Sequence, residues 1–148
     1  MIKSIPIPTA GVSLGLAALG NLLQPYSPLM KYTCGILAAI LLAMLLIKIL
    51  RYPKLVHADM TGNPILGSVA ATFFMTTMQL CVYIKDFAPF LCEAIWLAAV
   101  AAHAILIIWF SKNFMLNLEL KNVFPTFFIA YVGIAVSYTH LRAHETSL

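Results

Sequence analysis

The sequence predicts an all-α, polytopic membrane protein. Of its 148 residues, 62% are hydrophobic and only 9% are Asp, Glu, Lys or Arg, and the mean hydropathy is +0.95. A soluble domain usually carries about 25% of these charged residues. So few charges cannot cover the surface of a water-soluble globule, whereas the core of a bilayer is itself apolar. Charge-free runs long enough for spanning helices recur along the chain, which supports the same fold class.

Four complete spans and a truncated fifth are expected from these runs. A helix needs about 20 residues to cross the hydrocarbon core, and Pro25 and Pro28 separate the first two runs because proline ends a helix. The predicted spans cover residues 8–23, 30–50, 64–84, 87–110 and 123–136. Lys31 and Lys48 lie near the ends of the second span, where we expect their long side chains to reach out to the membrane interface. Residues 51–63 are predicted to form a polar connection.

The distribution of basic residues predicts the orientation of the spans. If the amino terminus is cytoplasmic, the inner segments hold Lys3, Lys48, Arg51, Lys54, Lys112 and Lys121, and the outer turns hold Lys31 and Lys85. Cytoplasmic loops of membrane proteins carry an excess of Lys and Arg. We therefore expect a multi-pass protein of the cell membrane with its amino terminus in the cytoplasm.

The end of the chain does not fit the pattern of a spanning helix. Continuing the fifth span would bring His140, Arg142 and Glu145 to membrane depth, and one charge at the bilayer centre costs about 2.5–3.5 kcal/mol on insertion scales. From about Ser137 the residues resemble the translation of a sequencing-adapter oligonucleotide. We therefore predict a transmembrane domain fragment over residues 1–137 and a non-native tail over residues 138–148, and we assign no site to that tail.

Polar and small side chains distinguish the odd-numbered spans from the even-numbered ones. The second and fourth spans are apolar around most of their circumference, whereas polar residues of the third recur at spacings of four, four, three and four. These spacings place them on one helical face. The members of this stripe are Ser68, Thr72, Thr76, Gln79 and Tyr83. Weaker stripes pass through Ser13 in the first span and Gly133 in the fifth.

Two interpretations of these stripes stay open. Small and hydroxylated residues often mark helix–helix contacts in lipid, and Gly11 and Gly15 fit such a packing motif. Alternatively, the stripes face a common water-filled path, whose lining would then include Ser13, Ser68, Thr72, Thr76, Gln79 and Gly133. A lining without carboxylates would not repel anions. The amino ends of the odd-numbered helices would also make the cytoplasmic mouth slightly electropositive.

Three segments carry a resemblance to a known family. They are Ile5-Pro-Ile-Pro-Thr-Ala-Gly-Val-Ser-Leu-Gly15 with its continuation to Asn21, Asn63-Pro-Ile-Leu-Gly-Ser68 with its continuation to Thr77, and Phe124-Pro-Thr-Phe-Phe-Ile-Ala-Tyr-Val-Gly133. In this order the segments resemble the first, third and fifth helices of the tellurite-resistance/dicarboxylate transporter family, which includes the plant guard-cell slow anion channels.

The resemblance implies a parent protein of ten transmembrane helices around a central pore, of which this chain would be the amino-terminal half. The odd-numbered helices would line the pore, and the protein would be a homotrimer. The implied function is transmembrane transport of anions (C4-dicarboxylates such as malate, chloride, or sulfite- and tellurite-related species) by a channel or carrier. The expected partners are membrane lipid, small anions and further copies of the chain.

Two other classes of protein are alternatives to an anion transporter. An intramembrane serine enzyme would need Ser13 or Ser68 beside His103, but the sequence holds no Gly-x-Ser-x-Gly elbow and no acid that clearly orients the histidine. A membrane assembly fragment without transport of its own is the other alternative. We interpret His103 as a packing residue or as a group for pore lining, proton coupling or subunit contact, and Glu93 as a solvated carboxylate near the interface.

The sequence predicts neither a cofactor nor a metal site. His57 and Asp59 form one short pair of ligand types without further ligands, and three cysteines (Cys34, Cys81 and Cys92) lie in apolar stretches at spacings that do not suit a metal. The nine Lys and Arg residues are spread along the chain rather than gathered in a patch, so we expect no nucleic-acid partner.

Overall fold

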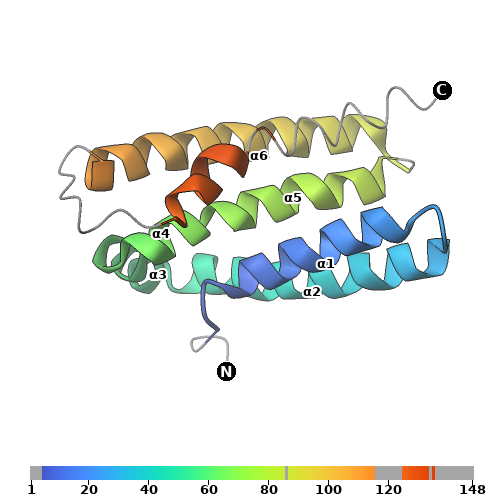
Figure 1. Ribbon diagram of the computed structural model, residues 1–148, viewed down its shortest axis with the longest axis horizontal. Helices are drawn as coiled ribbons and strands as arrows, with labels where there is room; N and C mark the ends of the chain where they lie inside the picture. Colours follow the sequence, from blue (N-terminus) through green and yellow to red (C-terminus); the bar gives the residue numbers. More distant parts are fainter. Residues whose placement is uncertain (1–4, 86, 116–124, 134, 136–148) are drawn as a thin grey trace.

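The computed structural model describes residues 5–85, 87–115, 125–133 and 135, which form helices that run side by side along the long axis of the molecule (Figure 1). The elements are α1 (Thr9–Leu23), α2 (Pro28–Arg51), α3 (Pro53–Gly62), α4 (Pro64–Val69), α5 (Ala71–Ile84), α6 (Pro89–Phe110) and a π-helical turn, η2 (Ser111–Met115). Residues 127–133 are also helical. The described part contains helices and no strand, in agreement with the all-α prediction.

Prolines determine where several of these helices begin. Pro28, Pro53, Pro64 and Pro89 each occupy the start of a helix, where the missing N–H has no intrahelical partner and the fixed φ suits the first turn. Asn63 also caps α4, because its side-chain oxygen accepts a hydrogen bond of 2.9 Å from the backbone N–H of Ile65. The starts of the second, third and fourth predicted spans therefore lie within two residues of the observed starts.

Most of the polar connection predicted over residues 51–63 is helical and forms α3. Pro53 begins the helix, and the N–H of Val56 donates to the carbonyl of Tyr52 at 3.2 Å. No residue of α3 is buried. The helix is only 10 residues long and contains Lys54, His57 and Asp59, and for this reason the sequence indicated no more than a polar connection between spans.

The third span is bent rather than continuous. The break falls at Ala70, between α4 and α5, and is flanked by Ser68, whose hydroxyl donates to Ile65 O at 2.9 Å, and Thr72, whose hydroxyl donates to Val69 O at 2.6 Å. Serine and threonine that bond back to their own helix often bend it. Together α4 and α5 still provide a span of 21 residues, Pro64–Ile84.

Three helices are long and apolar enough to cross a bilayer, and they differ in burial. Within an apolar stretch of 18 residues in each span, 61% of the residues are buried in Pro64–Ile84, against 22% in Pro28–Arg51 and 17% in Pro89–Phe114. The span formed by α4 and α5 is therefore the inner one, and α2 and α6 are outer helices that expose apolar side chains such as Ile36, Ile40 and Ile105. This confirms the predicted difference between the third span and its two apolar neighbours.

Helix α1 is shorter than the first predicted span requires. It has 15 residues, or about 22 Å at 1.5 Å per residue, whereas the hydrocarbon core is about 30 Å thick. Four complete spans were expected, and three described helices are long enough to cross the bilayer. The shorter α1 lies between α2 and α5 (Figure 1). Of the predicted fifth span, residues 127–133 are described as helix, and the tail over residues 138–148 lies outside the described residues.

Glycines allow α1, α2 and α5 to meet around one aromatic ring. A Cβ at Gly35 would overlap the ring of Tyr83, and a Cβ at Gly20 would overlap the Tyr83 hydroxyl. That Gly20 Cβ would also lie 2.9 Å from Cys34 Cβ and 3.0 Å from the backbone carbonyl oxygen of Lys31. The Lys31 carbonyl is part of the backbone and cannot move aside cheaply, so Gly20 is required for this close approach. At Gly35 the Tyr83 ring itself would have to move.

We expect Gly20→Ala and Gly15→Ala to change stability in opposite directions. Gly20→Ala should lower the free energy of unfolding by about 1–3 kcal/mol, because overpacking displaces neighbouring side chains or backbone. A Cβ at Gly15 meets nothing within 4 Å, so Gly15→Ala should raise it by about 0.5–1 kcal/mol through the better helix propensity of alanine. Unfolding in mixed detergent micelles measures both. Equal effects of the two substitutions would contradict the packing described around Tyr83.

Candidate functional site

The polar stripe predicted on the third span lies inside the helix bundle, against α1 and α2. We call this group the polar seam and define it as the buried residues Ser13, Ser68, Thr72, Thr76, Gln79 and Tyr83. Each of them is at most 9% exposed. The sequence therefore predicted correctly that the five seam residues of the third span share one face, and the structure adds that this face meets neighbouring helices, with Ser13 contributed by α1.

Two hydrogen bonds from α5 fix α1 beside it. Thr76 Oγ1 donates to Thr72 O at 2.7 Å and also lies 3.2 Å from Ala10 O, and Tyr83 Oη donates to Ala17 O at 2.7 Å. Both interhelical pairs are 66 residues apart in sequence, which means that the two helices run parallel and in register. Their amino ends consequently lie at the same end of the bundle.

The remaining seam residues have other hydrogen-bond partners. Ser13 Oγ donates to the carbonyl of Ala38 on α2 at 2.7 Å, and Asn21 Nδ2 donates to Gln79 Oε1 at 2.9 Å. The hydroxyls of Ser68 and Thr72 donate within the bent span itself. Interhelical hydrogen bonds in membranes contribute about 0.6 kcal/mol on average. The seam thus performs the packing role that the sequence left open, while its role in lining a water-filled path stays a prediction.

The glycines singled out in the sequence lie in two different environments. Gly11 and Gly15 face open space, since a Cβ at either would meet nothing within 4 Å, so their predicted packing role has no partner among the described residues. Gly133, predicted to line a pore, is buried, and a Cβ there would overlap His103 and Met75. Gly133 therefore lets residues 127–133 approach α5 and α6 closely.

His103 joins α6 to the helical residues 127–133. It is fully buried, and its Nε2 lies 2.8 Å from the carbonyl oxygen of Ala130. Because a carbonyl only accepts, Nε2 must carry a proton and donate it to this bond. The described residues provide no hydrogen-bond partner for Nδ1. This geometry agrees with the packing interpretation of His103.

Both lysines of α2 point into the bundle, which corrects the prediction that they reach the membrane interface. Lys31 and Lys48 are each 4% exposed. They lie on the buried face of α2 that also includes Gly35, Ala38 and Leu45. The 3.6-residue period of these five positions was a signal that could have located the lysines. The expectation that lysines near the end of a span reach the interface considers only the depth of the charge in the membrane. It does not consider which face of the helix carries the side chain, so the inward direction of Lys31 and Lys48 was not predicted.

At one end of the seam Lys31 lies against Tyr83. Its Nζ is 5.4 Å from the centroid of the Tyr83 ring and 5.9 Å from that of Tyr32. A cation within about 6 Å of an aromatic face is attracted by the ring quadrupole. Within the described part of the chain, the ion pair between Lys48 and Asp59 is the only one, so Lys31 has no carboxylate partner there.

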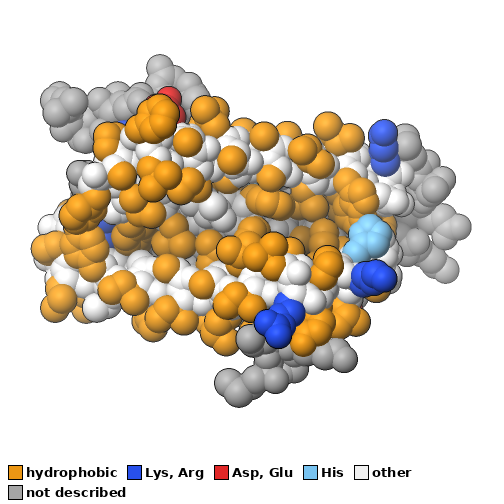
Figure 2. Space-filling view, turned by 180° about the vertical axis from the view of Figure 1, so that it is seen from behind, with side chains coloured by type: hydrophobic (Ala, Val, Ile, Leu, Met, Phe, Trp, Pro, Cys, Tyr) orange, Lys and Arg blue, Asp and Glu red, His pale blue; other side chains and the backbone are white. Residues whose placement is uncertain are grey.

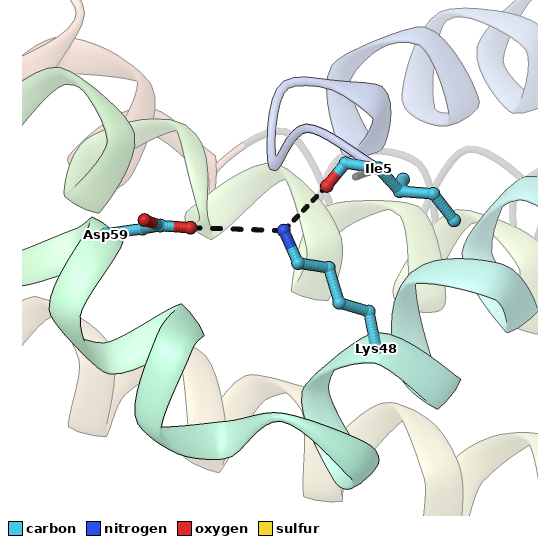
Figure 3. Close-up of polar contacts among 3 residues, drawn as sticks. All are labelled: Ile5, Lys48 and Asp59. Carbon is cyan, nitrogen blue, oxygen red and sulfur yellow. Dashed lines mark hydrogen bonds and ion pairs between the residues drawn. The ribbon is translucent and has the colours of Figure 1, made fainter. Parts of the chain in front are cut away.

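At the other end Lys48 connects three segments (Figure 3). Its Nζ donates to the carbonyl of Ile5 at 2.6 Å and lies 3.9 Å from Asp59 Oδ2 on α3. The Asp59 side chain is 48% exposed, so this ion pair is screened by solvent and contributes little. The short bond to Ile5 O is the stronger contact, and it holds the segment before α1 against the end of α2.

The charges of the described residues favour anions over cations inside the bundle. The buried polar and charged residues of the described chain include two lysines and no carboxylate, and Glu93 is exposed. No three His, Cys, Asp or Glu side chains of the described residues gather in a way that could hold a metal ion. The hydroxyls of Ser13 and Ser68 donate to carbonyls, and no hydrogen bond joins either of them to His103 among the described residues. The arrangement therefore does not support a serine enzyme.

Comparison with known proteins identifies one related family. The sequence model of a family described as voltage-dependent anion channel matches residues 4–145. The chain has no significant match among curated proteins or among solved structures.

We expect Lys48→Met to loosen the segment before α1 and Asp59→Asn to leave it nearly unchanged. A hydrogen bond from a charged donor contributes about 1.5–3 kcal/mol, whereas an exposed ion pair contributes about 0–1 kcal/mol. Hydrogen exchange at the amides of Thr9 and Ala10, which bond to Pro6 O and Ile7 O, should accelerate about tenfold or more in Lys48→Met. Similar acceleration in both variants would mean that the ion pair, and not the bond to Ile5 O, holds this segment.

Proposed function

Because the chain belongs to the voltage-dependent anion channel family, which the match over residues 4–145 shows, we propose that its inner helices form part of the wall of a transmembrane pathway for small anions. The match also bears out the resemblance of its first, third and fifth spans to tellurite-resistance/dicarboxylate transporters. The protein is accordingly a multi-pass membrane protein, and its family is one of channels rather than enzymes.

The absence of carboxylates from the described buried residues is the observation that carries this proposal. Lys31 and Lys48 lie at opposite ends of the buried face of α2, and neutral hydroxyls and amides lie between them on α5. In a medium of low dielectric constant, a buried cation lowers the energy of a nearby anion over several ångströms. An anion is therefore favoured over a cation at both ends of the seam.

The parallel alignment of α1 and α5 adds to this electrostatic preference. Each helix carries the equivalent of about half a positive charge at its amino end, and the two amino ends lie at the end of the bundle that holds Lys48. We propose that this end is cytoplasmic, as the distribution of basic loop residues predicts, and that it forms the electropositive inner mouth of the pathway.

We propose that the seam residues, together with Gly133, border the pathway in the assembled protein. Hydroxyls that already donate to carbonyls, such as those of Ser13 and Tyr83, would bind an anion only weakly. Weak binding favours passage over capture, because conduction requires that an ion can leave each site. Chloride, C4-dicarboxylates such as malate, and sulfite- or tellurite-related anions are the substrates we propose.

A purely structural role for the seam is the second candidate. The observation that favours it is that the hydroxyls of Ser13, Thr76 and Tyr83 all reach carbonyls of neighbouring helices. In that case the chain would belong to a membrane assembly whose pathway runs elsewhere, for example along the open face of α1 at Gly11 and Gly15.

We expect Gln79→Glu to reduce anion flux and Gln24→Glu to leave it unchanged. A glutamate at position 79 keeps an oxygen that can accept from Asn21, so the packing contact survives, but it places a negative charge on the seam. The repulsion at an effective dielectric constant of about 20 corresponds to roughly a tenfold or greater loss of flux. Gln24 is exposed beyond the end of α1, and its substitution controls for the change in net charge.

Proteoliposomes with chloride or malate gradients provide the measurement, made on the protein in its assembled form. Equal flux in the Gln79→Glu and Gln24→Glu proteins would place the pathway away from the seam and support the structural role. Reversal potentials that favour cations in the unsubstituted protein would contradict the proposed function itself.

A further inference from the structure

An apolar groove runs along the outer face of the bundle between α2 and α6, with α5 behind it (Figure 2). It consists of two adjoining hollows of about 230 Å³ and 380 Å³, which share Met60, Phe74 and Leu106. The first hollow is lined by apolar side chains alone, including Ile7, Leu45 and Phe73. The second opens between α3 and α6, where His57 and Trp109 lie with their ring centroids 6.0 Å apart.

Positive charges surround the end of this groove at which α2 meets α3. Arg51, Lys54 and Lys112 are exposed there, and in Figure 2 basic side chains lie beside the histidine at that end of the face. Within the described residues, none of these three side chains forms an ion pair or a hydrogen bond. The one described carboxylate at this end, Asp59, is already beside Lys48. The three cations therefore have no internal counter-charge in the described part of the chain.

We propose that this groove binds an anionic phospholipid, with an acyl chain along the apolar floor and the headgroup phosphate beside Arg51 and Lys54. The groove lies between the two outer helices, whose exposed apolar side chains face lipid. Basic side chains next to a spanning helix attract anionic lipid headgroups, and tryptophan is the residue that typically marks the boundary between acyl chains and headgroups. The groove thus offers both parts of a phospholipid a complementary surface.

Charge complementarity selects this occupant over a protein helix. A second copy of the chain would bring the same three cations to the same end of the groove, and like charges would repel. A zwitterionic lipid would fill the apolar floor equally well but would neutralise the unpaired cations less. The site lies on the outer face of α2 and α6, so the inference does not depend on where anions pass.

Fluorescence quenching by brominated lipid tests the site directly, because Trp109 lines the second hollow. Trp96→Phe leaves Trp109 as the single tryptophan of the full chain. In bilayers that mix brominated phosphatidylglycerol or brominated phosphatidylcholine with unbrominated lipid, we expect phosphatidylglycerol to bind beside Trp109 at least about fivefold more tightly. Arg51→Gln with Lys54→Gln should bring the two lipids to equal affinity.

Lys85→Gln is the matched control, because Lys85 follows α5 at the opposite end of the bundle. It should leave the preference for phosphatidylglycerol intact. Equal quenching by both lipids in the starting protein, or a preference that survives loss of Arg51 and Lys54, would overturn the proposal. Little quenching by either lipid would also overturn it, since the groove would then be covered by protein.

Discussion

The organisation of this protein depends on one constraint: polar groups within a bilayer must find their partners inside the protein. Helix α5 meets that constraint by placing its polar side chains against the backbone carbonyls of its neighbours. Thr76 and Tyr83 reach α1 at two positions about two turns apart, and Ser13 of α1 in turn reaches α2. Gly20 and Gly35 leave the space that the Tyr83 ring needs. The position of α1 and α2 beside α5 follows from these few contacts.

The same contacts connect the architecture to the function of the family. Because the seam is satisfied by hydroxyls, amides and carbonyls, the inner helices pack without any buried carboxylate among the described residues. The charges that do enter the bundle are the ammonium groups of Lys31 and Lys48, one at each end of α2. A bundle held together in this way presents a neutral to positive interior, which is the electrostatic condition for passing anions. Its outer helices are left to interact with lipid.

Much of this architecture could be predicted from the sequence, and the exceptions share a cause. The charge-free runs located three helix starts to within two residues of Pro28, Pro64 and Pro89. The period of the stripe on the third span placed its polar residues on one face. Periodicity states which residues share a face but not what that face meets, so packing against α1 could not be separated from a water-filled path. The inward direction of Lys31 and Lys48 was missed because the rule applied to them considered depth alone. The helical state of α3 was not predicted because the segment is short and contains Lys54, His57 and Asp59.

The central claim is that side-chain hydrogen bonds across the seam hold α1 to α5. It is tested most directly by a double-mutant cycle on Asn21 and Gln79, whose side-chain amides are 2.9 Å apart. Asn21→Ala, Gln79→Ala and the double variant are compared by their free energies of unfolding in bilayer-like micelles. We expect a favourable coupling energy of about 0.6–1.7 kcal/mol, and additivity for a control cycle of Gln79 with the exposed Gln24. Additive effects of Asn21→Ala and Gln79→Ala would contradict it.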